Sequence, residues 1–186
     1  MPEWFYLACD ISTPNGARRM RANYSHPTLN DSLLDGNILG TNGVFVRRDI
    51  AISFPFHENR RLSGSEDYEL WLRLRSKFSL QFDERSTSCL IEHEGRSMNT
   101  MPAEDIIRRI VYLIELIETS SEFADAKQAK LRVKSYLYGY LAVHLASANN
   151  FRRTSIKYLI ASIVNNPSLI SFRRILIVAR DVFSRR

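Results

Sequence analysis

The segment SGSEDYELWLR, residues 63–73, gives the clearest indication of how this chain folds. A flexible Gly/Ser turn precedes two adjacent carboxylates, Glu66 and Asp67, and the apolar spacing that follows predicts an amphipathic helix ending near Lys77. Free backbone N–H groups and the helix dipole at such an N-terminus favour ionised carboxylates. An ionised carboxylate at a loop–helix junction can take a proton from a substrate hydroxyl. The same residues also suit a plain helix start, since Ser63 and Glu66 have capping-box spacing.

The composition is typical of a folded globular chain. With 186 residues, 45% of them hydrophobic, the chain is long enough for one ordinary domain, or for a small domain with an appendage. The two cysteines, Cys9 and Cys89, suit buried apolar positions and suggest neither a disulfide framework nor a zinc site. No signal peptide and no apolar run of about 18 residues is present. A reducing, cytoplasmic setting is therefore expected, either free in the cytoplasm or at the inner face of the membrane.

The net charge of +6 is unevenly distributed. A basic tail of this kind fits nucleic acid, anionic lipid or an acidic partner, and it equally fits a solvated helix face that aids solubility. The basic residues cluster early and in the last third, at Arg18, Arg19, Arg21, Arg152, Arg153, Arg173, Arg174, Arg180, Arg185 and Arg186.

Up to about Thr100 the pattern predicts short strands, polar turns and one helix. His93 would project from the last strand beside apolar residues, a position that suits a hydrogen-bonded structural histidine as well as a functional one. The polar stretch from Arg18 to Asp35 is predicted to be a long loop, and a turn is expected at Pro14–Gly16. Strands are expected at Phe5–Cys9, Gly43–Val46, Phe78–Phe82 and Ser88–Glu94.

After Pro102 the pattern becomes helical almost to the end. The last helix is apolar on one side and arginine-rich on the other, which fits either an anionic membrane surface or packing onto the preceding helices. The stripe Tyr136/Tyr140/His144 is expected in the core. The four expected helices carry their apolar residues at Ile106–Ile117, at Val133–Ala148, at Ile156, Leu159, Ile160, Ile163 and Val164, and at Leu169–Phe183. Helices joined by short links usually pack antiparallel.

Three segments in order resemble the acceptor-side half of family 2 glycosyltransferases, which have a GT-A fold. The first, Gly36–Arg48 (GNILGTNGVFVRR), is similar to the family's Asn-rich turn, buried strand and following arginines. The second, Glu66–Arg73, looks like its Glu-Asp motif and helix. The third, His93–Met98, is similar to the His-x-Gly-Ser stretch after the last core strand. The resemblance covers about residues 5–100.

The resemblance implies an inverting transfer of a sugar from a nucleoside-diphosphate donor to an acceptor hydroxyl. Asp67 then corresponds to the general base and Glu66 to a neighbouring acceptor contact. His93 would approach the metal or diphosphate, and a divalent metal (Mg²⁺ or Mn²⁺) would offset the charge on the leaving group. The remaining acceptor-side residues implied are Asn37, Thr41 and Asn42.

The chain lacks the features of the nucleotide-binding half with which members of the family begin. It has no parallel βαβ nucleotide-binding unit and no Asp-x-Asp motif, since Asp10, Asp31 and Asp35 stand alone. The expected fold is therefore α/β, with a partial GT-A-like sheet and flanking helices in residues 1–100 and a C-terminal helical bundle in residues 101–186. Such a chain looks like a C-terminal part whose donor half comes from a separate chain, and alone it could be inactive.

Two other function classes stay open. The helical part and its basic last helix could form a non-catalytic module that docks on a partner or a membrane surface. Nucleic-acid binding draws on the basic charge, but no recognition-helix motif and no aromatic–basic interleaving on a sheet supports it.

Overall fold

The structure is a computed structural model that describes residues 2–13, 16, 18–20, 26–91, 101–123, 126–169 and 172–183. The chain is mixed α/β, as the sequence predicts, and divides into two compact units. Unit 1 comprises residues 1–33 and 37–101, and unit 2 comprises residues 34–36 and 102–186.

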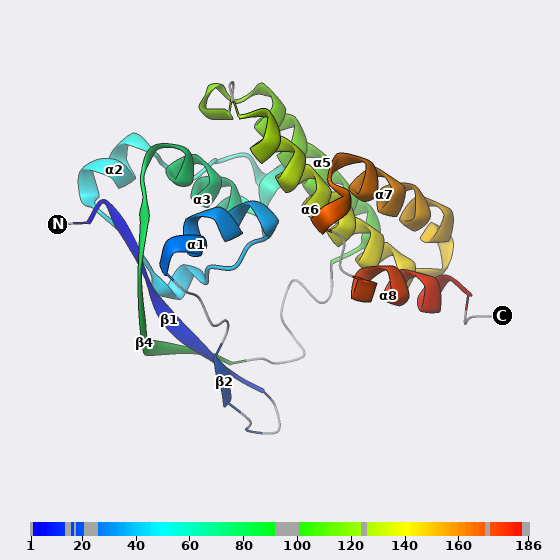
Figure 1. Ribbon diagram of the computed structural model, residues 1–186, viewed down its shortest axis with the longest axis horizontal. Coiled ribbons are helices and arrows are strands. Elements are labelled where there is room, and N and C mark those ends of the chain that lie inside the picture. Colours follow the sequence, from blue (N-terminus) through cyan, green and yellow to red (C-terminus); the bar gives the residue numbers. More distant parts are fainter. Residues whose placement is uncertain are drawn as a thin grey trace. The chain divides into compact units, whose positions relative to one another are not determined.

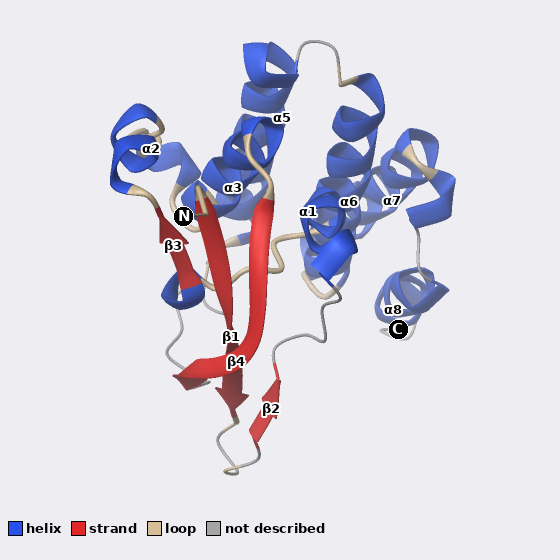
Figure 2. Cartoon of the chain, turned by 60° about the vertical axis from the view of Figure 1, so that its left-hand side comes forward, coloured by secondary structure: helices blue, strands red, loops and turns tan. Residues whose placement is uncertain are grey.

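Unit 1 is built on a four-stranded sheet whose central strand is β1 (Figure 2). The first part of β1 pairs antiparallel with β3, its last part pairs antiparallel with β2, and its other edge pairs in parallel with β4. The strands are β1 (Trp4–Ser12), β2 (Arg18–Met20), β3 (Val44–Val46) and β4 (Leu80–Ile91). The helical segments of unit 1 are α1 (His26–Ser32), η2 (Thr41–Gly43), α2 (Arg48–Ser53), η3 (Arg60–Leu62) and α3 (Glu66–Lys77). The short helix η1 (Leu33–Asp35) begins in unit 1 and ends in unit 2.

The core of unit 1 lies between β1 and the helices α1 and α3. Trp4 and Tyr6 alternate on one face of β1 and are almost fully buried, and Trp4 stacks on Trp71 of α3 with ring centroids 6.1 Å apart. Leu29 of α1 and Leu74 of α3 have no exposed surface and belong to the same cluster. The residues on one face of β1 and the apolar face of α3 thus pack together in one apolar layer.

Two predictions for unit 1 are wrong. The Arg18–Asp35 stretch is not a long loop, because it contains β2, α1 and η1. The strands expected at Phe78–Phe82 and Ser88–Glu94 are one strand, β4, whose parallel register with β1 shifts between Leu7 and Cys9. The polar residues at this shift read as a break in the sequence, but a bulge lets a strand carry extra residues and continue. The predicted turn at Pro14–Gly16 lies partly outside the described residues.

Arg85 pairs with Asp83 in the bulged part of β4. The Arg85 guanidinium and backbone N–H both donate to the Asp83 carboxylate, and these hydrogen bonds lower the pKa of Asp83 to about 2. This pair is exposed to solvent, so it contributes orientation more than stability.

Unit 2 is helical, and its central helix α6 contacts α5, α7 and α8 (Figure 1). None of its described helices, and none elsewhere in the described part of the chain, is both long and apolar enough to cross a bilayer. The elements are α5 (Ala103–Thr119), η4 (Ser121–Phe123), α6 (Lys127–Ala146), η5 (Asn149–Phe151), α7 (Arg152–Asn165), η6 (Pro167–Leu169) and α8 (Phe172–Phe183).

Helix α7 packs on α6 through serines rather than through its isoleucines. The Ser155 hydroxyl donates to the carbonyl of Ala142 at 2.7 Å, and the Ser162 hydroxyl donates to the carbonyl of Ser135 at 2.6 Å. Both α7 serines are fully buried. Because Gly139 of α6 faces Ser162 across the contact, the two backbones approach closely.

The apolar residues expected to bury α7 are therefore mostly exposed. Val164 is 77% and Ile160 is 55% exposed, and Ile156 and Ile163 are also on the surface. The prediction from periodicity is wrong here, because hydrophobic spacing finds the apolar face but cannot tell whether a neighbour covers it.

Candidate functional site

The Asp67 carboxylate sits in the first turn of α3, held by two hydrogen-bond donors. One oxygen accepts a bond of 3.1 Å from the side-chain amide of Asn37, and the other accepts the backbone N–H of Tyr68 at 2.7 Å. Helix α3 begins at Glu66 and ends at Lys77, as the sequence predicts. The carboxylate therefore has a defined orientation at a helix N-terminus, where the macrodipole favours negative charge.

The capping box expected between Ser63 and Glu66 is not formed. Ser65, without a side-chain cap bond, is the N-cap, and Ser63 instead follows η3, where its backbone N–H donates to the carbonyl of Arg60. The Glu66 carboxylate accepts the backbone N–H of Gly64. Gly64 has a φ of 89°, a left-handed conformation that bends the chain back toward Glu66 and that glycine adopts without strain.

Asn37 is the residue that joins the first two motif segments. Its amide N–H₂ donates to Asp67, and its carbonyl oxygen is buried with no hydrogen-bond partner among the described residues. A buried acceptor without a donor is costly in a folded protein and often marks a place where a ligand or water binds.

Thr41 and Asn42 do not take part in the contact between Asn37 and Asp67. Neither forms a hydrogen bond with Asp67 in the described part of the chain. Asn42 donates to the Ser88 hydroxyl of β4 at 2.8 Å, and both Thr41 and Asn42 are exposed. Of the four residues predicted to surround the base, the structure thus brings Asn37 into direct contact, while Glu66 adjoins it in sequence.

The metal predicted from the resemblance has no support from the described residues. His93 lies outside them, and within them no group of three His, Cys, Asp or Glu side chains is arranged to hold an ion. Cys9 and Cys89 are free thiols, the first buried and the second half-buried.

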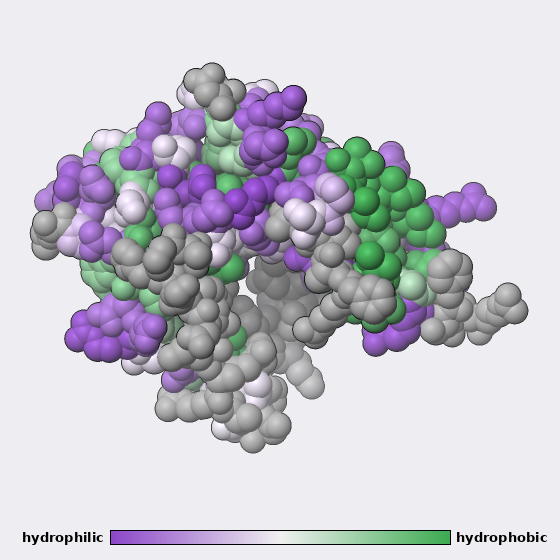
Figure 3. Space-filling model, in the orientation of Figure 1, coloured by the Kyte–Doolittle hydropathy of each residue, from purple (hydrophilic) through white to green (hydrophobic). Residues whose placement is uncertain are grey.

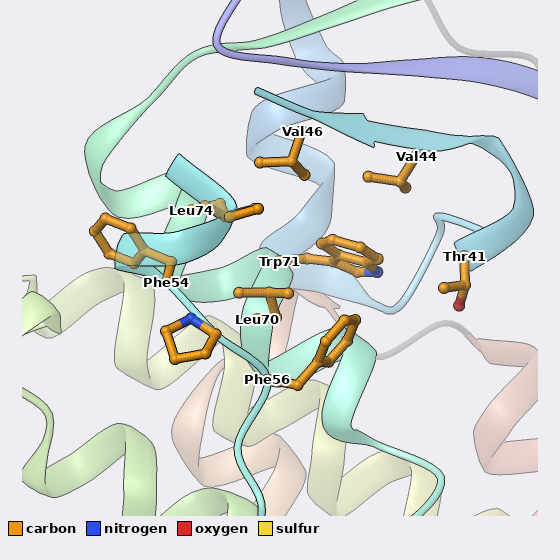
Figure 4. A pocket seen from close by; sticks show the side chains of 10 residues that line it. Thr41, Val44, Val46, Phe54, Phe56, Leu70, Trp71 and Leu74 are labelled. Atoms are coloured by element: carbon orange, nitrogen blue, oxygen red, sulfur yellow. The ribbon is translucent and has the colours of Figure 1, made fainter. Parts of the chain in front are cut away.

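An apolar pocket of about 230 Å³ opens beside α3, between β3 and α2 (Figure 4). Trp71 and Leu70 form part of its wall, and Thr41 and the half-exposed Phe56 line it near the surface. Phe56 meets Trp71 edge to face, with ring centroids 6.4 Å apart. The apolar spacing of 66–77 predicts the helix but gives no sign of the pocket that Trp71 lines.

The loop after α2 is held against α3 by a pair of residues that the sequence analysis did not single out. Arg73 makes two hydrogen bonds to the Glu69 carboxylate, of 2.7 and 2.9 Å, and another to the carbonyl of Pro55. Both side chains are largely buried. Their i, i+4 spacing is the signal that was available, and the pair positions Pro55 and Phe56 at the pocket.

A second hollow, of about 350 Å³, lies between α6 and α8 in unit 2. It is lined by Tyr136, Tyr140 and His144, the stripe predicted to be core, with Arg174 5.2 Å from the centre of the Tyr136 ring. The prediction that this stripe is core is wrong, because Tyr136 and Tyr140 are half-buried and His144 is exposed. The buried row of α6 is one residue further along, at Val133, Leu137, Leu141 and Leu145. Partial desolvation of the ring, and then the nearby charge of Arg109, lower the pKa of His144.

Comparison with known proteins adds no relative: no family model, no curated protein and no solved structure matches the chain.

Proposed function

We propose that unit 1 is the acceptor-side part of an inverting glycosyltransferase similar to family 2, with Asp67 as the general base. The sugar would come from a nucleoside-diphosphate donor, and the acceptor would supply a hydroxyl. A separate polypeptide or chain segment would contribute the donor-binding half and, with His93, a divalent metal (Mg²⁺ or Mn²⁺).

The hydrogen bond between Asn37 and Asp67 carries this proposal. It joins two motif segments that are 30 residues apart, and the buried carbonyl oxygen of Asn37 beside it has no hydrogen-bond partner among the described residues. The third segment follows β4, which pairs with the same central strand as β3. The first segment thus includes β3 of this sheet and the second forms α3, which covers it, while residues 93–98 of the third segment lie outside the described residues.

The chemistry requires a base at this position. The Asp67 carboxylate would take the proton of the acceptor hydroxyl while the oxygen of that hydroxyl forms a bond to the anomeric carbon of the sugar. The bond from that carbon to the diphosphate breaks at the same time, on the opposite face, so the configuration inverts. Asn37 would keep the carboxylate oriented toward the attacking oxygen.

Asp67→Asn tests the assignment, because it keeps the shape and the Asn37 contact region but removes the base. The chain is co-expressed with the protein encoded directly upstream, and transfer of sugar from nucleotide-sugar donors is measured. We expect Asp67→Asn to lower transfer by roughly 10²-fold or more. Asp49→Asn is the matched control, since Asp49 is exposed on α2 and pairs with Arg47. Full activity of Asp67→Asn would refute the base assignment.

A second candidate function, docking on an anionic membrane surface, is favoured by the exposed side of α7. Ile160 and Val164 lie one turn apart on that side, and Figure 3 shows hydrophobic side chains gathered over α7. Leu176 of α8 is also half exposed. Contiguous apolar surface of this kind marks a docking surface more often than a solvated one.

The charge of the same region complements anionic lipid headgroups. Residues 152–186 contain eight basic side chains and a single acidic one, Asp181. Apolar insertion together with basic side chains is the combination that holds interfacial helices on a bilayer.

Vesicle sedimentation tests the membrane candidate. The chain should sediment with phosphatidylcholine vesicles that contain phosphatidylglycerol, and added salt should release it. The double change Ile160→Glu/Val164→Glu should abolish sedimentation, while Ile52→Glu, at an exposed position of unit 1, should not. Equal sedimentation of all three proteins, or equal binding to neutral vesicles, would reject this function.

A further inference from the structure

The apolar pocket of unit 1 contains one buried polar atom whose hydrogen-bonding capacity is unused. The indole Nε1–H of Trp71 has no acceptor among the described residues, although Trp71 is only 2% exposed. Figure 4 shows this nitrogen on the side of the pocket that Thr41 lines. A buried donor without a partner destabilises the folded state, so a hydrogen-bond acceptor bound in the pocket would be stabilised by it.

The other tryptophan of the chain shows that the fold can satisfy a buried indole. Trp4 stacks on Trp71, and its Nε1–H donates to the carbonyl of Phe78 at 3.4 Å. The two rings belong to the same core cluster and are both almost fully buried, and Figure 4 shows the Trp71 nitrogen at the end of its ring toward Thr41. The indole donor left without an acceptor therefore belongs to the tryptophan that lines the pocket.

We propose that this pocket is a binding site for an apolar, ring-sized group that bears a hydrogen-bond acceptor, such as a carbonyl oxygen. The ligand's oxygen accepts a hydrogen bond from the Trp71 indole N–H, and the ligand's ring packs against the aliphatic side chains of β3 and α3. The pocket shares Thr41 with the acceptor-side residues that the resemblance implies, but neither Asp67 nor Asn37 lines it, so ligand binding here can be tested separately from glycosyl transfer.

The lining and the size define the ligand class. A cavity of about 150 Å³ is enough to hold benzene, so about 230 Å³ suits a single ring with one small substituent. The lining side chains are apolar apart from Thr41 and the Trp71 nitrogen, and none of them is charged, which disfavours ionic ligands. Phe56, 47% exposed at the entrance, adds an aromatic edge.

Binding is tested with two probes of nearly identical shape. Acetophenone carries a carbonyl oxygen, and α-methylstyrene has a CH₂ group in its place. The full chain is labelled with ¹⁵N-tryptophan and titrated with each probe while both indole N–H signals are followed. We expect acetophenone to move the Trp71 signal downfield, α-methylstyrene to shift it less, and the Trp4 signal to serve as an internal reference. Absence of binding by both probes, or a shift confined to Trp4, would overturn the proposal.

Trp71→Phe isolates the hydrogen bond, because it keeps an aromatic ring and removes the donor. For each protein we compare the dissociation constant of acetophenone with that of α-methylstyrene. The greater hydrophobicity of α-methylstyrene affects this ratio equally in both proteins, so a change in the ratio reports the hydrogen bond. We expect the preference for acetophenone to fall roughly threefold to tenfold relative to the unchanged chain, the value of one neutral hydrogen bond. An unchanged ratio would contradict the role of the Trp71 donor.

A neighbouring pair of substitutions locates the site without altering the core. Ala51 lines the pocket and is exposed, so Ala51→Phe should fill its entrance and weaken both probes by roughly tenfold or more. Ile52, the next residue, is 69% exposed and does not line the pocket, so Ile52→Phe should leave both affinities unchanged. Equal effects of the two changes would show that the probes bind elsewhere.

Discussion

At the scale of single residues, the close packing around Gly43 explains why the motif segment contains a glycine there. A Cβ atom at this position would lie 2.4 Å from the carbonyl oxygen of Leu7 and 2.6 Å from the Tyr6 ring. Contact with backbone cannot be relieved by rotating a side chain. Gly43 therefore lets the segment that carries Asn37 and Thr41 lie directly against β1.

Gly43→Ala is expected to destabilise the chain by about 2 kcal/mol or more, because β1 or η2 must move to admit the methyl group. The measurement is urea unfolding followed by tryptophan fluorescence. Thr41→Ala, at an exposed position of the same short helix, should change the free energy of unfolding by no more than about 0.5 kcal/mol. A destabilisation of Gly43→Ala within that range would show that the strand adjusts freely.

At the scale of elements, α3 and α7 differ in how far their sequence patterns predicted them. The bounds of α3 were predicted correctly, since charges, the preceding glycine and the apolar spacing all indicate the same helix. Helix α7 has an equally clear apolar row, but its serines bond to α6 and its isoleucines are exposed. Periodicity fixes the geometry of a helix, and only the neighbouring backbone decides which row is buried.

Because the serines of α7 are buried and its isoleucines are exposed, we expect its substitutions to affect stability in the opposite order to those of an ordinary amphipathic helix. Ser162→Leu should destabilise unit 2 by about 3 kcal/mol, because the larger side chain meets Gly139 and the hydroxyl that donates to the carbonyl of Ser135 is lost. Val164→Ser removes an exposed apolar side chain and should be nearly neutral. Urea unfolding followed by circular dichroism gives both values, and the reverse order would exclude the serine-lined interface.

At the scale of the whole molecule, the two units give separate spectroscopic signals. Both tryptophans, Trp4 and Trp71, are in unit 1, so tryptophan fluorescence reports the unfolding of that unit. The long helices α5, α6 and α7 are in unit 2 and contribute most of the helical signal. A chain of two compact units need not unfold in one two-state transition.

We therefore expect the two destabilising substitutions to act on different transitions. Gly43→Ala should lower the unfolding midpoint measured by fluorescence more than the midpoint measured by circular dichroism at 222 nm. Ser162→Leu should do the opposite. If each variant moved both midpoints equally, the chain would unfold as a single cooperative body.

Four features could be predicted without the structure: the mixed α/β class, a strand over Phe5–Cys9, the helix from Glu66 to Lys77 and the helical character of the second half. These follow from local patterns of charge and hydrophobicity that need no distant partner. The tertiary structure alone decided the continuity of β4, the exposed side of α7, the Asn37–Asp67 contact and the Trp71 pocket. Each depends on residues far apart in sequence, and their contacts form only because the sheet and its covering helices bring them within hydrogen-bonding or van der Waals distance.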